Sequence, residues 1–298
     1  MRCAFAENER WGQFRPGRPA VFRTARQSPR RTSFPLPARA SPSRTRDRLP
    51  TCPQIQVFLP KTADKLIVIS SYLESKYKRV NSSIVVLPPL IDEERYKNLV
   101  FTKENSDDVI NFIYVGFPFA TDGRKVSRNS FKDRLDLAIE SLYELRDMNF
   151  IFTIYGITKE QYLNVLPEHT DLLSKMVGKI LFLGKIDNDA AIEAIAKADF
   201  TILLRDVNEM TTAGFPTKVV ESITCGTPVI TTKTSDLDQY IRDGRNGFFV
   251  SFSQLKTDLY NILMLNTAEK CNMKIYCREN MIFSYKNFRE RISHFFST

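Results

Sequence analysis

The chain has 298 residues, of which 43% are hydrophobic, so it can bury one large core or two ordinary ones. Its net charge of +9 equals the charge of residues 1–50, which hold twelve arginines and three acidic residues; the neutral remainder offers no long-range attraction to nucleic acid or anionic lipid. Five cysteines without a regular framework and only two histidines argue against a disulfide scaffold or a zinc site, and no apolar run has the length of a membrane span.

Residues 1–54 are rich in arginine, proline and serine, and seven of the fifteen prolines lie in the first fifty residues. Such a composition buries too little apolar area to offset the entropy of ordering, so the segment is predicted to be disordered. Three interpretations stay open: an organelle transit peptide, a basic arm for RNA or lipid, and a segment translated from unrelated DNA. The third is favoured, because the segment contains no lysine while the rest of the chain uses lysine freely.

Two short strands and a helix follow. The runs "KLIVIS" (65–70) and "SSIVVLPP" (82–89) are apolar and β-branched, which is typical of buried strands. Ser70 or Ser71 is placed to cap a helix over "YLESKYKRV". The polar, acidic residues 91–108 resemble a linker.

From residue 109 onward, strands alternate with helices. One predicted helix carries Leu135, Ile139, Leu142 and Leu145 on a single face. This alternation predicts an α/β fold with a doubly wound parallel sheet over residues 101–298, whose ligands bind beyond the carboxyl ends of the strands. The predicted strands are 109–116, 150–156, 179–184, 199–205, 227–232 and 247–250, and the predicted helices are 131–147, 159–177, 188–198, 235–242 and those within 253–296.

Cations and helix N-termini converge on this carboxyl edge. The loop after the first strand of the sheet contains Arg124, Lys125, Arg128 and Lys132. Helix N-termini add free backbone N–H groups and a partial positive charge, which together attract anions. The set therefore predicts an anion site, although each cation by itself is better explained as a solvated loop charge.

The stretch "TTAGFPTKVVESITCGTPVI" (211–230) sharpens this prediction. Gly214 lets backbone approach a ligand, and Pro216 suits a first helical turn, which places Thr217 and Lys218 beside free amides. Glu221 would repel a phosphate but can accept two hydrogen bonds from the vicinal diol of a ribose. Together these residues predict a nucleoside diphosphate site; the alternative for Glu221 is an exposed helical acid.

The same stretch, with "ADFTILL" before it and "DGRNGFFV" after it, resembles retaining glycosyltransferase family 4 (group 1), and in particular bacterial members that build surface or capsular polysaccharide. The phrases "FIYVG", "KDRLDLAIESL" and "LFLGKI" fit the family in order, and the resemblance covers about residues 63–298. It implies a GT-B fold, of which residues 101–298 form the C-terminal donor-binding Rossmann-like domain. Residues 55–100 would be a remnant of the acceptor-side domain and the linker.

The resemblance also implies site residues. Glu221 would be the second glutamate of the E-x7-E motif and would bind the ribose, while Lys132 would contact the diphosphate. The donor-binding set is completed by Gly116, Gly214, Phe215, Pro216, Thr217 and Thr227, and the catalytic set is Lys132, Lys218 and Glu221. This sequence differs from the family pattern at two positions. Ala213 stands where the first glutamate is expected, and Phe117 stands in place of an arginine, for which Arg124 or Arg128 would substitute.

The implied activity is retaining transfer of a sugar from a UDP- or GDP-linked donor to a glycan or lipid-linked acceptor, in the cytoplasm and without metal, cofactor or nucleic acid. Turnover by this N-terminally short chain, peripheral association with the inner face of the membrane, and homodimerisation are left open. The last of these follows because the helix within 283–296 would leave an apolar face uncovered. The alternatives are a non-catalytic nucleotide-sugar-binding module and a GT-B epimerase or phosphorylase; an RNA-binding tail is the weakest.

Overall fold

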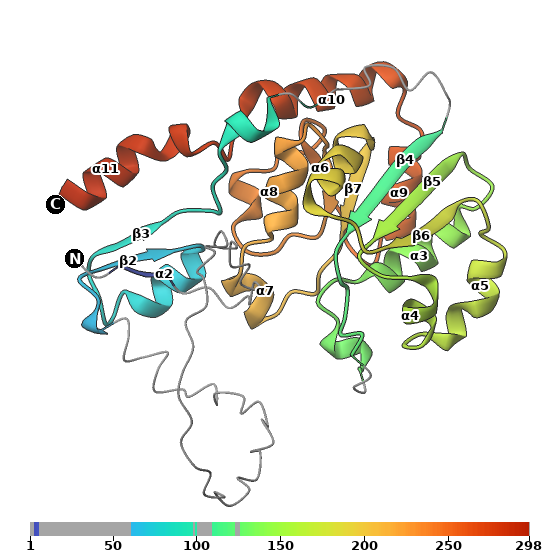
Figure 1. The fold of residues 1–298 in the computed structure, drawn as a ribbon, viewed down its shortest axis with the longest axis horizontal. Helices are drawn as coiled ribbons and strands as arrows, with labels where there is room; N and C mark the ends of the chain where they lie inside the picture. Colours follow the sequence, from blue (N-terminus) through green and yellow to red (C-terminus); the bar gives the residue numbers. More distant parts are fainter. Residues whose placement is uncertain (1–2, 6–60, 98, 100–108, 123–125, 298) are drawn as a thin grey trace, which may run out of the picture.

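The computed structural model describes residues 3–5, 61–97, 99, 109–122 and 126–297, and it contains two parallel β-sheets (Figure 1). The smaller sheet has the order β1-β2-β3, and α2 connects its last two strands. Its elements are β1 (Cys3–Phe5), β2 (Lys65–Val68), α2 (Ser71–Tyr77) and β3 (Ile84–Val86). The tail predicted to be disordered lies mostly outside the described residues, and its described part is the edge strand β1.

The start of α2 follows the sequence prediction. Ser70 is its N-cap, and the Ser70 hydroxyl accepts a hydrogen bond from the Leu73 amide. The region predicted as a linker begins with a short 3-10 turn, η1 (Glu93–Tyr96).

The larger sheet has six parallel strands in the order β6-β5-β4-β7-β8-β9. The chain runs outward from β4 to β6, returns to place β7 beside β4, and then runs outward again, which is the strand order of a Rossmann fold. The doubly wound prediction is confirmed, and the topological switch point lies between β4 and β7. The strands are β4 (Ile110–Val115), β5 (Phe150–Tyr155), β6 (Ile180–Gly184), β7 (Phe200–Leu203), β8 (Val229–Thr231) and β9 (Gly247–Phe249).

The helices agree with most of the predicted ones in position but are more divided, and the helix predicted at 235–242 is wrong: the structure has only a 3-10 turn there, over Leu237–Gln239. The predicted helix 159–177 is broken at Pro167, which begins a 3-10 turn, and a short helix that was not predicted, α7, is fixed by a capping box between Asn208 and Thr211. The helices are α3 (Leu135–Glu144), α4 (Lys159–Leu163), α5 (Thr170–Ser174), α6 (Asn188–Lys197), α7 (Glu209–Ala213), α8 (Thr217–Thr224), α9 (Leu255–Leu263), α10 (Thr267–Asn280) and α11 (Arg289–Ser297). The 3-10 turns are η2 (Arg128–Ser130), η3 (Pro167–His169), η4 (Leu237–Gln239) and η5 (Tyr285–Phe288).

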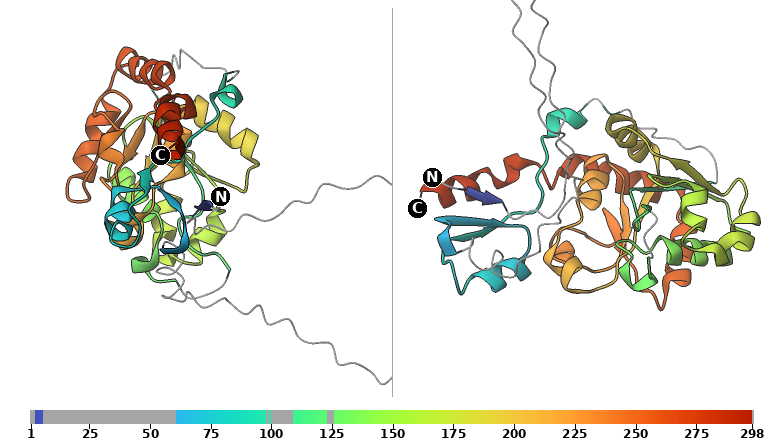
Figure 2. Two further views of the ribbon diagram at one scale, coloured as in Figure 1. Left: turned by 90° about the vertical axis from the view of Figure 1, so that its left-hand side faces the viewer. Right: turned by 60° about the horizontal axis from the view of Figure 1, so that its bottom comes forward.

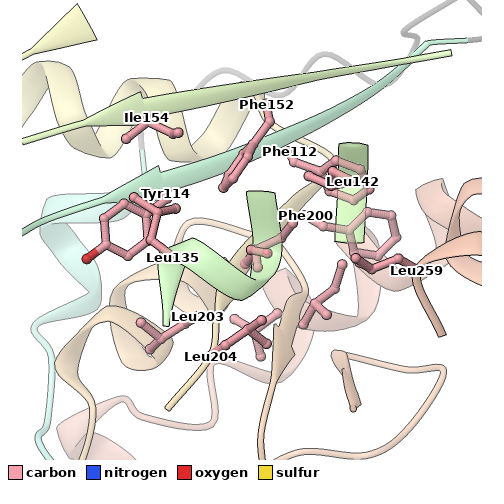
Figure 3. Packing of buried hydrophobic residues seen from close by; sticks show 14 of the residues in the cluster. Phe112, Tyr114, Leu135, Leu142, Phe152, Ile154, Phe200, Leu203, Leu204 and Leu259 are labelled. Carbon is pink, nitrogen blue, oxygen red and sulfur yellow. The ribbon is translucent and has the colours of Figure 1, made fainter. Parts of the chain in front are cut away.

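Helices cover both faces of the larger sheet. On one face, α3 and α9 pack against aromatic and aliphatic side chains of β4, β5 and β7, among them Phe112, Phe152 and Phe200 (Figure 3). The predicted face of α3 is confirmed, because Leu135, Ile139, Leu142 and Leu145 are all buried. On the other face, Ile113 packs with side chains of α6 and with Tyr96 of η1. Strands β7 and β8 are buried along their whole length, as strands covered on both sides must be.

The C-terminal helix returns to the smaller sheet, where α11 lies near β3 (Figures 1 and 2). Phe295 packs on Val85 and Leu87, and the Lys65 ammonium donates to the Phe295 carbonyl at 2.6 Å. The expectation of an uncovered apolar face on this helix is therefore wrong: β3 covers it. Among the described residues, no helix is both long and apolar enough to cross a membrane.

Two hydrogen bonds connect the start of α2, beside the smaller sheet, to segments that pack around the larger sheet. The Ser71 amide donates to the Asp236 carboxylate at 2.7 Å, and the Ser70 hydroxyl donates to the Ala213 carbonyl at 2.7 Å. Asp236 follows β8, and Ala213 ends α7. The smaller sheet is thus held beside the carboxyl ends of the larger sheet's strands.

Candidate functional site

A pocket opens at the switch point, where the carboxyl ends of β4 and β7 face α8. It is a small hollow of about 10 Å³ that opens to solvent. Its walls are formed by Tyr114, Val115, Ile195, Thr201, Leu203, Lys218 and Glu221. Its place agrees with the general rule that ligands of such sheets bind beyond the strand ends at the switch point.

Gly116 allows a lysine to lie across the end of β4. Its φ is +145°, and a Cβ atom there would be 2.3 Å from the Cε atom and 2.5 Å from the Nζ atom of Lys218. The next strand also ends in a glycine: at Gly156, with φ of +100°, a Cβ atom would lie 2.3 Å from the Gly116 carbonyl oxygen. A side chain at Gly116 would push Lys218 away from the end of β4, and one at Gly156 would push the ends of β4 and β5 apart.

Below this lysine lies a buried charge cluster. The carboxylate of Asp133, whose exposed fraction is 0%, accepts hydrogen bonds from Tyr114 Oη at 2.7 Å and Arg205 Nε at 2.8 Å, and from Lys218 Nζ at 2.5 Å. We call these four residues the Asp133 cluster. Two cations share one carboxylate, so the cluster carries a net charge of +1.

The charge states of the cluster follow from its surroundings. Burial opposes ionisation of Asp133, but the nearby charges of Lys218 and Arg205 outweigh it and hold the pKa of the carboxyl below its usual range. Burial raises the pKa of Tyr114 well above its usual range, so the phenol stays protonated and acts as a donor. Burial lowers the pKa of Lys218, and the Asp133 carboxylate opposes that effect.

The N-terminus of α8 points its free amides toward this region. Pro216 is the N-cap and provides no side-chain cap. Within the described part of the chain, the amides of Thr217 and Lys218 donate to no acceptor. Phe215 is buried and contacts the edges of other aromatic rings, which fixes the turn ahead of the helix.

Gly214 has a packing role. Its amide donates to the Met210 carbonyl at 3.0 Å and closes α7. A Cβ atom at this position would lie 3.1 Å from the same oxygen, so the glycine permits the tight passage from α7 to α8. The sequence interpretation, a close approach of backbone to a ligand, is not needed to explain this residue.

Glu221 lies one turn beyond Lys218 on α8 and lines the pocket. It is partly buried and so is not an exposed acid, and this burial raises the pKa of its carboxyl against the opposing charges of Lys218 and Arg95. No hydrogen bond or ion pair to this carboxylate is present among the described residues. Such a carboxylate is available to accept hydrogen bonds from a ligand.

The loop cations predicted from the sequence divide into three groups. Lys132 is exposed beside Asp133, and its amide donates to the Pro118 carbonyl at 2.8 Å. Arg128 instead pairs with Glu168 at 2.9 Å and with Glu140 at 3.4 Å on the surface. Arg124 and Lys125 lie outside the described residues. The structure therefore brings Lys132 and Lys218 to the site and commits Arg128 elsewhere.

Thr227 corrects a second expectation. Its side chain is fully buried, and its hydroxyl donates to the Ile195 carbonyl at 2.6 Å. The residue therefore supports the wall of the pocket, whereas the sequence placed it on the base and ribose. In the part of the chain that the structure describes, no group of three His, Cys, Asp or Glu residues could hold a metal ion.

Three residues of the Asp133 cluster were not selected from the sequence. Tyr114 and Arg205 come at the ends of predicted strands, and Asp133 directly follows Lys132. The feature of the sequence that could have identified Arg205 is a charged side chain at the end of a buried strand, as in "TILLR".

Comparison with known proteins agrees with this picture. The family model for Glycosyl transferases group 1 matches residues 125–273, which is half of the chain and includes α8. No protein of curated function matches the sequence.

Solved structures match the fold. HepE from Anabaena, in complex with UDP and glucose, is 17% identical with a TM-score of 0.57, and the match covers 82% of this chain and 66% of that one. Sucrose-phosphate synthase from Thermosynechococcus elongatus is 15% identical with a TM-score of 0.60, covering 86% and 63%. TarM from S. aureus is 16% identical with a TM-score of 0.58, covering 82% and 46%. The fold is thus GT-B-like, and the chain spans less than two thirds of the length of these relatives.

Proposed function

The chain belongs to the group 1 glycosyl transferases, and from this premise we propose that it binds a nucleotide-sugar donor in the switch-point pocket and transfers the sugar with retention. One observation carries the proposal: Lys218, which belongs both to the Asp133 cluster and to the first turn of α8, lines one pocket with Glu221, whose carboxylate has no partner among the described residues. The site thus has one part suited to an anion and, beside it, one part suited to hydroxyl groups, and a nucleoside diphosphate carries both.

The diphosphate lies at the start of α8. The amides of Thr217 and Lys218 donate to its oxygens, and the helix dipole favours the negative charge. The ammonium groups of Lys132 and Lys218 add charge-assisted hydrogen bonds. These groups also stabilise the negative charge that develops on the departing diphosphate.

The ribose lies beside Glu221, whose carboxylate accepts hydrogen bonds from both ring hydroxyls. In the transfer, the bond between the anomeric carbon and the diphosphate oxygen breaks, and its electron pair stays on that oxygen. The acceptor's hydroxyl oxygen forms the new bond to carbon, and its proton passes to the departing diphosphate.

The donor is a UDP- or GDP-linked sugar. The HepE complex with UDP and glucose supports a uridine donor, and the acceptor is a glycan or lipid-linked glycan of surface polysaccharide synthesis in the cytoplasm. The smaller sheet (65–86) belongs, on this proposal, to the acceptor side, and residues 109–297 form the donor domain.

Calorimetric titration with UDP, GDP and ADP tests the binding. One of the three should bind the folded chain, and Glu221→Ala and Lys132→Ala should each weaken that binding about tenfold, as expected for the loss of hydrogen bonds involving a charged group. Glu209→Ala is the control, because Glu209 is exposed and contacts Tyr72 and Lys76 of α2. A folded chain that binds none of the three nucleotides contradicts the proposal.

Product analysis separates transfer from the alternatives. With donor and acceptor glycan, a glycosyltransferase releases nucleoside diphosphate. An epimerase changes the donor sugar without acceptor, and a phosphorylase requires free phosphate. A chain that binds donor and yields none of these products is a non-catalytic nucleotide-sugar-binding module.

A further inference from the structure

Arg205 stands directly beyond the end of β7 at the switch point, and its backbone is held tightly. Its amide donates to the Thr232 hydroxyl at 2.9 Å, and the same hydroxyl donates to the Arg205 carbonyl at 2.7 Å. Thr232 follows β8, so two adjacent strand ends fix the position from which the guanidinium extends.

Hydrogen bonds within the protein satisfy only part of the Arg205 guanidinium. Its Nε atom donates to Asp133 Oδ1 at 2.8 Å, while Lys218 Nζ donates to Oδ2 of the same carboxylate. Within the described ranges, the two terminal nitrogens of Arg205 have no hydrogen-bond acceptor. The side chain is 10% exposed, which leaves these donors a route to the solvent side of the cluster.

The positive charge of the cluster depends on this residue. Lys218 and Asp133 by themselves would form a neutral pair, and Arg205 supplies the net +1. The described part of the loop after β4 supplies Lys132, which is exposed, but no buried cation. That loop begins with Phe117, which is apolar and 51% exposed, and its Arg128 pairs with Glu140 and Glu168.

We propose that Arg205 is a diphosphate-binding residue of the donor site, where its terminal nitrogens contact the phosphate nearest the sugar, beside Lys218. Asp133 is a positioning residue that orients both cations. A guanidinium can serve the two partners together, because Nε stays on the carboxylate while the Nη atoms donate to phosphate oxygens in the plane of the fork. A lysine, with one point charge, cannot do the same.

This inference rests on the proposed function, and it predicts a difference between two ligands. Arg205 should contribute to binding of a nucleoside diphosphate and hardly at all to binding of the matching monophosphate, which lacks the second phosphate. Free helix amides and Glu221 should contribute to both. The ratio of the two dissociation constants therefore reports on Arg205 separately from the rest of the site.

The test is calorimetric titration of the full chain with UDP and UMP, or with GDP and GMP if the wild type prefers guanine. In Arg205→Gln, the preference for the diphosphate should fall by about tenfold or more, with the affinity for the monophosphate within about twofold of wild type. The matched control is Lys274→Gln, which removes another buried cation, one that donates to the Ala196 and Ala198 carbonyls; its diphosphate preference should equal that of wild type.

Three results would overturn the inference. An unchanged preference in Arg205→Gln shows that the guanidinium does not contact the second phosphate. An equal loss of both ligands by a folded variant shows a structural role. If Arg205→Gln does not fold, Arg205→Lys replaces it; its preference should fall by about two- to fivefold, and a wild-type ratio overturns the inference. Failure of the wild type to bind any nucleoside diphosphate is a separate result, which removes the proposed function and this inference with it.

Discussion

Two charged regions at the carboxyl edge of the larger sheet look alike in the sequence and differ in the structure. In the surface group, Arg128 is 42% exposed and pairs with Glu140 and Glu168. In the Asp133 cluster, Arg205 and Lys218 share one carboxylate that has no exposure. The surface group has enough carboxylates to satisfy its arginine, whereas the Asp133 cluster has one carboxylate for two cations.

This difference decides which region can bind an anion. A phosphate approaching Arg128 must displace carboxylates that already neutralise it. A phosphate approaching the Asp133 cluster meets a residual positive charge in a partly desolvated place, where electrostatic interactions are less screened than on the surface. Counting cations along a sheet edge is therefore insufficient; the carboxylates paired with them must be counted too.

Removal of the shared carboxylate should have the largest effect. Asp133→Ala leaves Arg205 and Lys218 buried without a counter-charge, and breaking a buried ion pair in this way costs about 3–5 kcal/mol of unfolding free energy. Glu168→Ala, in the surface group, should change stability by less than about 1 kcal/mol. Urea unfolding of both variants measures the contrast, and similar losses in the two would show that the regions do not differ as described.

The glycine under Lys218 should have the next largest effect. Gly116→Ala places a Cβ atom against the lysine at a backbone conformation that favours glycine, which should cost about 1–3 kcal/mol and weaken nucleoside diphosphate binding. Gly178→Ala is the control, since φ is +81° there and nothing lies within 4 Å of the added atom. Thermal unfolding and calorimetry together check this; unchanged nucleotide affinity in Gly116→Ala would mean that the position of Lys218 is unimportant.

Replacing Glu221 should have a smaller effect on the unfolding free energy, and it should stabilise the fold where the two changes above destabilise it. Burial raises the pKa of this carboxyl in the folded chain, so its ionisation destabilises the fold as pH rises through the interval from the unfolded pKa, about 4.3, to the folded one. Glu221→Gln should accordingly be more stable than wild type at pH 7, and the advantage should disappear below about pH 4. Unfolding measured across this range tests the sign, and a variant less stable at pH 7 would contradict it.

The smallest effect is expected in the surface group itself. Arg128→Gln should change the unfolding free energy by less than about 1 kcal/mol, because its ion pairs are exposed and screened. Its nucleoside diphosphate affinity should match that of wild type. A tenfold loss of affinity would restore the sequence-based assignment of Arg128 to the donor site.

Local patterns were enough to predict the architecture. Apolar runs bounded by glycine and proline predicted the strands of the larger sheet, and the spacing of Leu135, Ile139 and Leu142 predicted the buried face of α3. One wall of the pocket could also be located from the sequence, because Lys218 and Glu221 lie within a single stretch that forms one short helix.

The Asp133 cluster could not be predicted in the same way. Asp133 and Arg205 are 72 residues apart, and Asp133 and Lys218 are 85 residues apart, so their contact depends on β7 returning to lie beside β4. The sequence also gives no means of telling that Arg128 meets Glu168, 40 residues away, or that the Thr227 hydroxyl faces a carbonyl of α6. The contacts between side chains that are distant in the sequence, more than the residue types, separated the residues that can bind a ligand from those with a structural role.

The central claim is most directly tested by a crystal structure of the chain in complex with the nucleoside diphosphate that it binds best. The account predicts that the diphosphate lies against the amides of Thr217 and Lys218 above Gly116, with the ribose hydroxyls within hydrogen-bond distance of the Glu221 carboxylate. A diphosphate bound elsewhere, or a Glu221 side chain turned into bulk water in that complex, would contradict it.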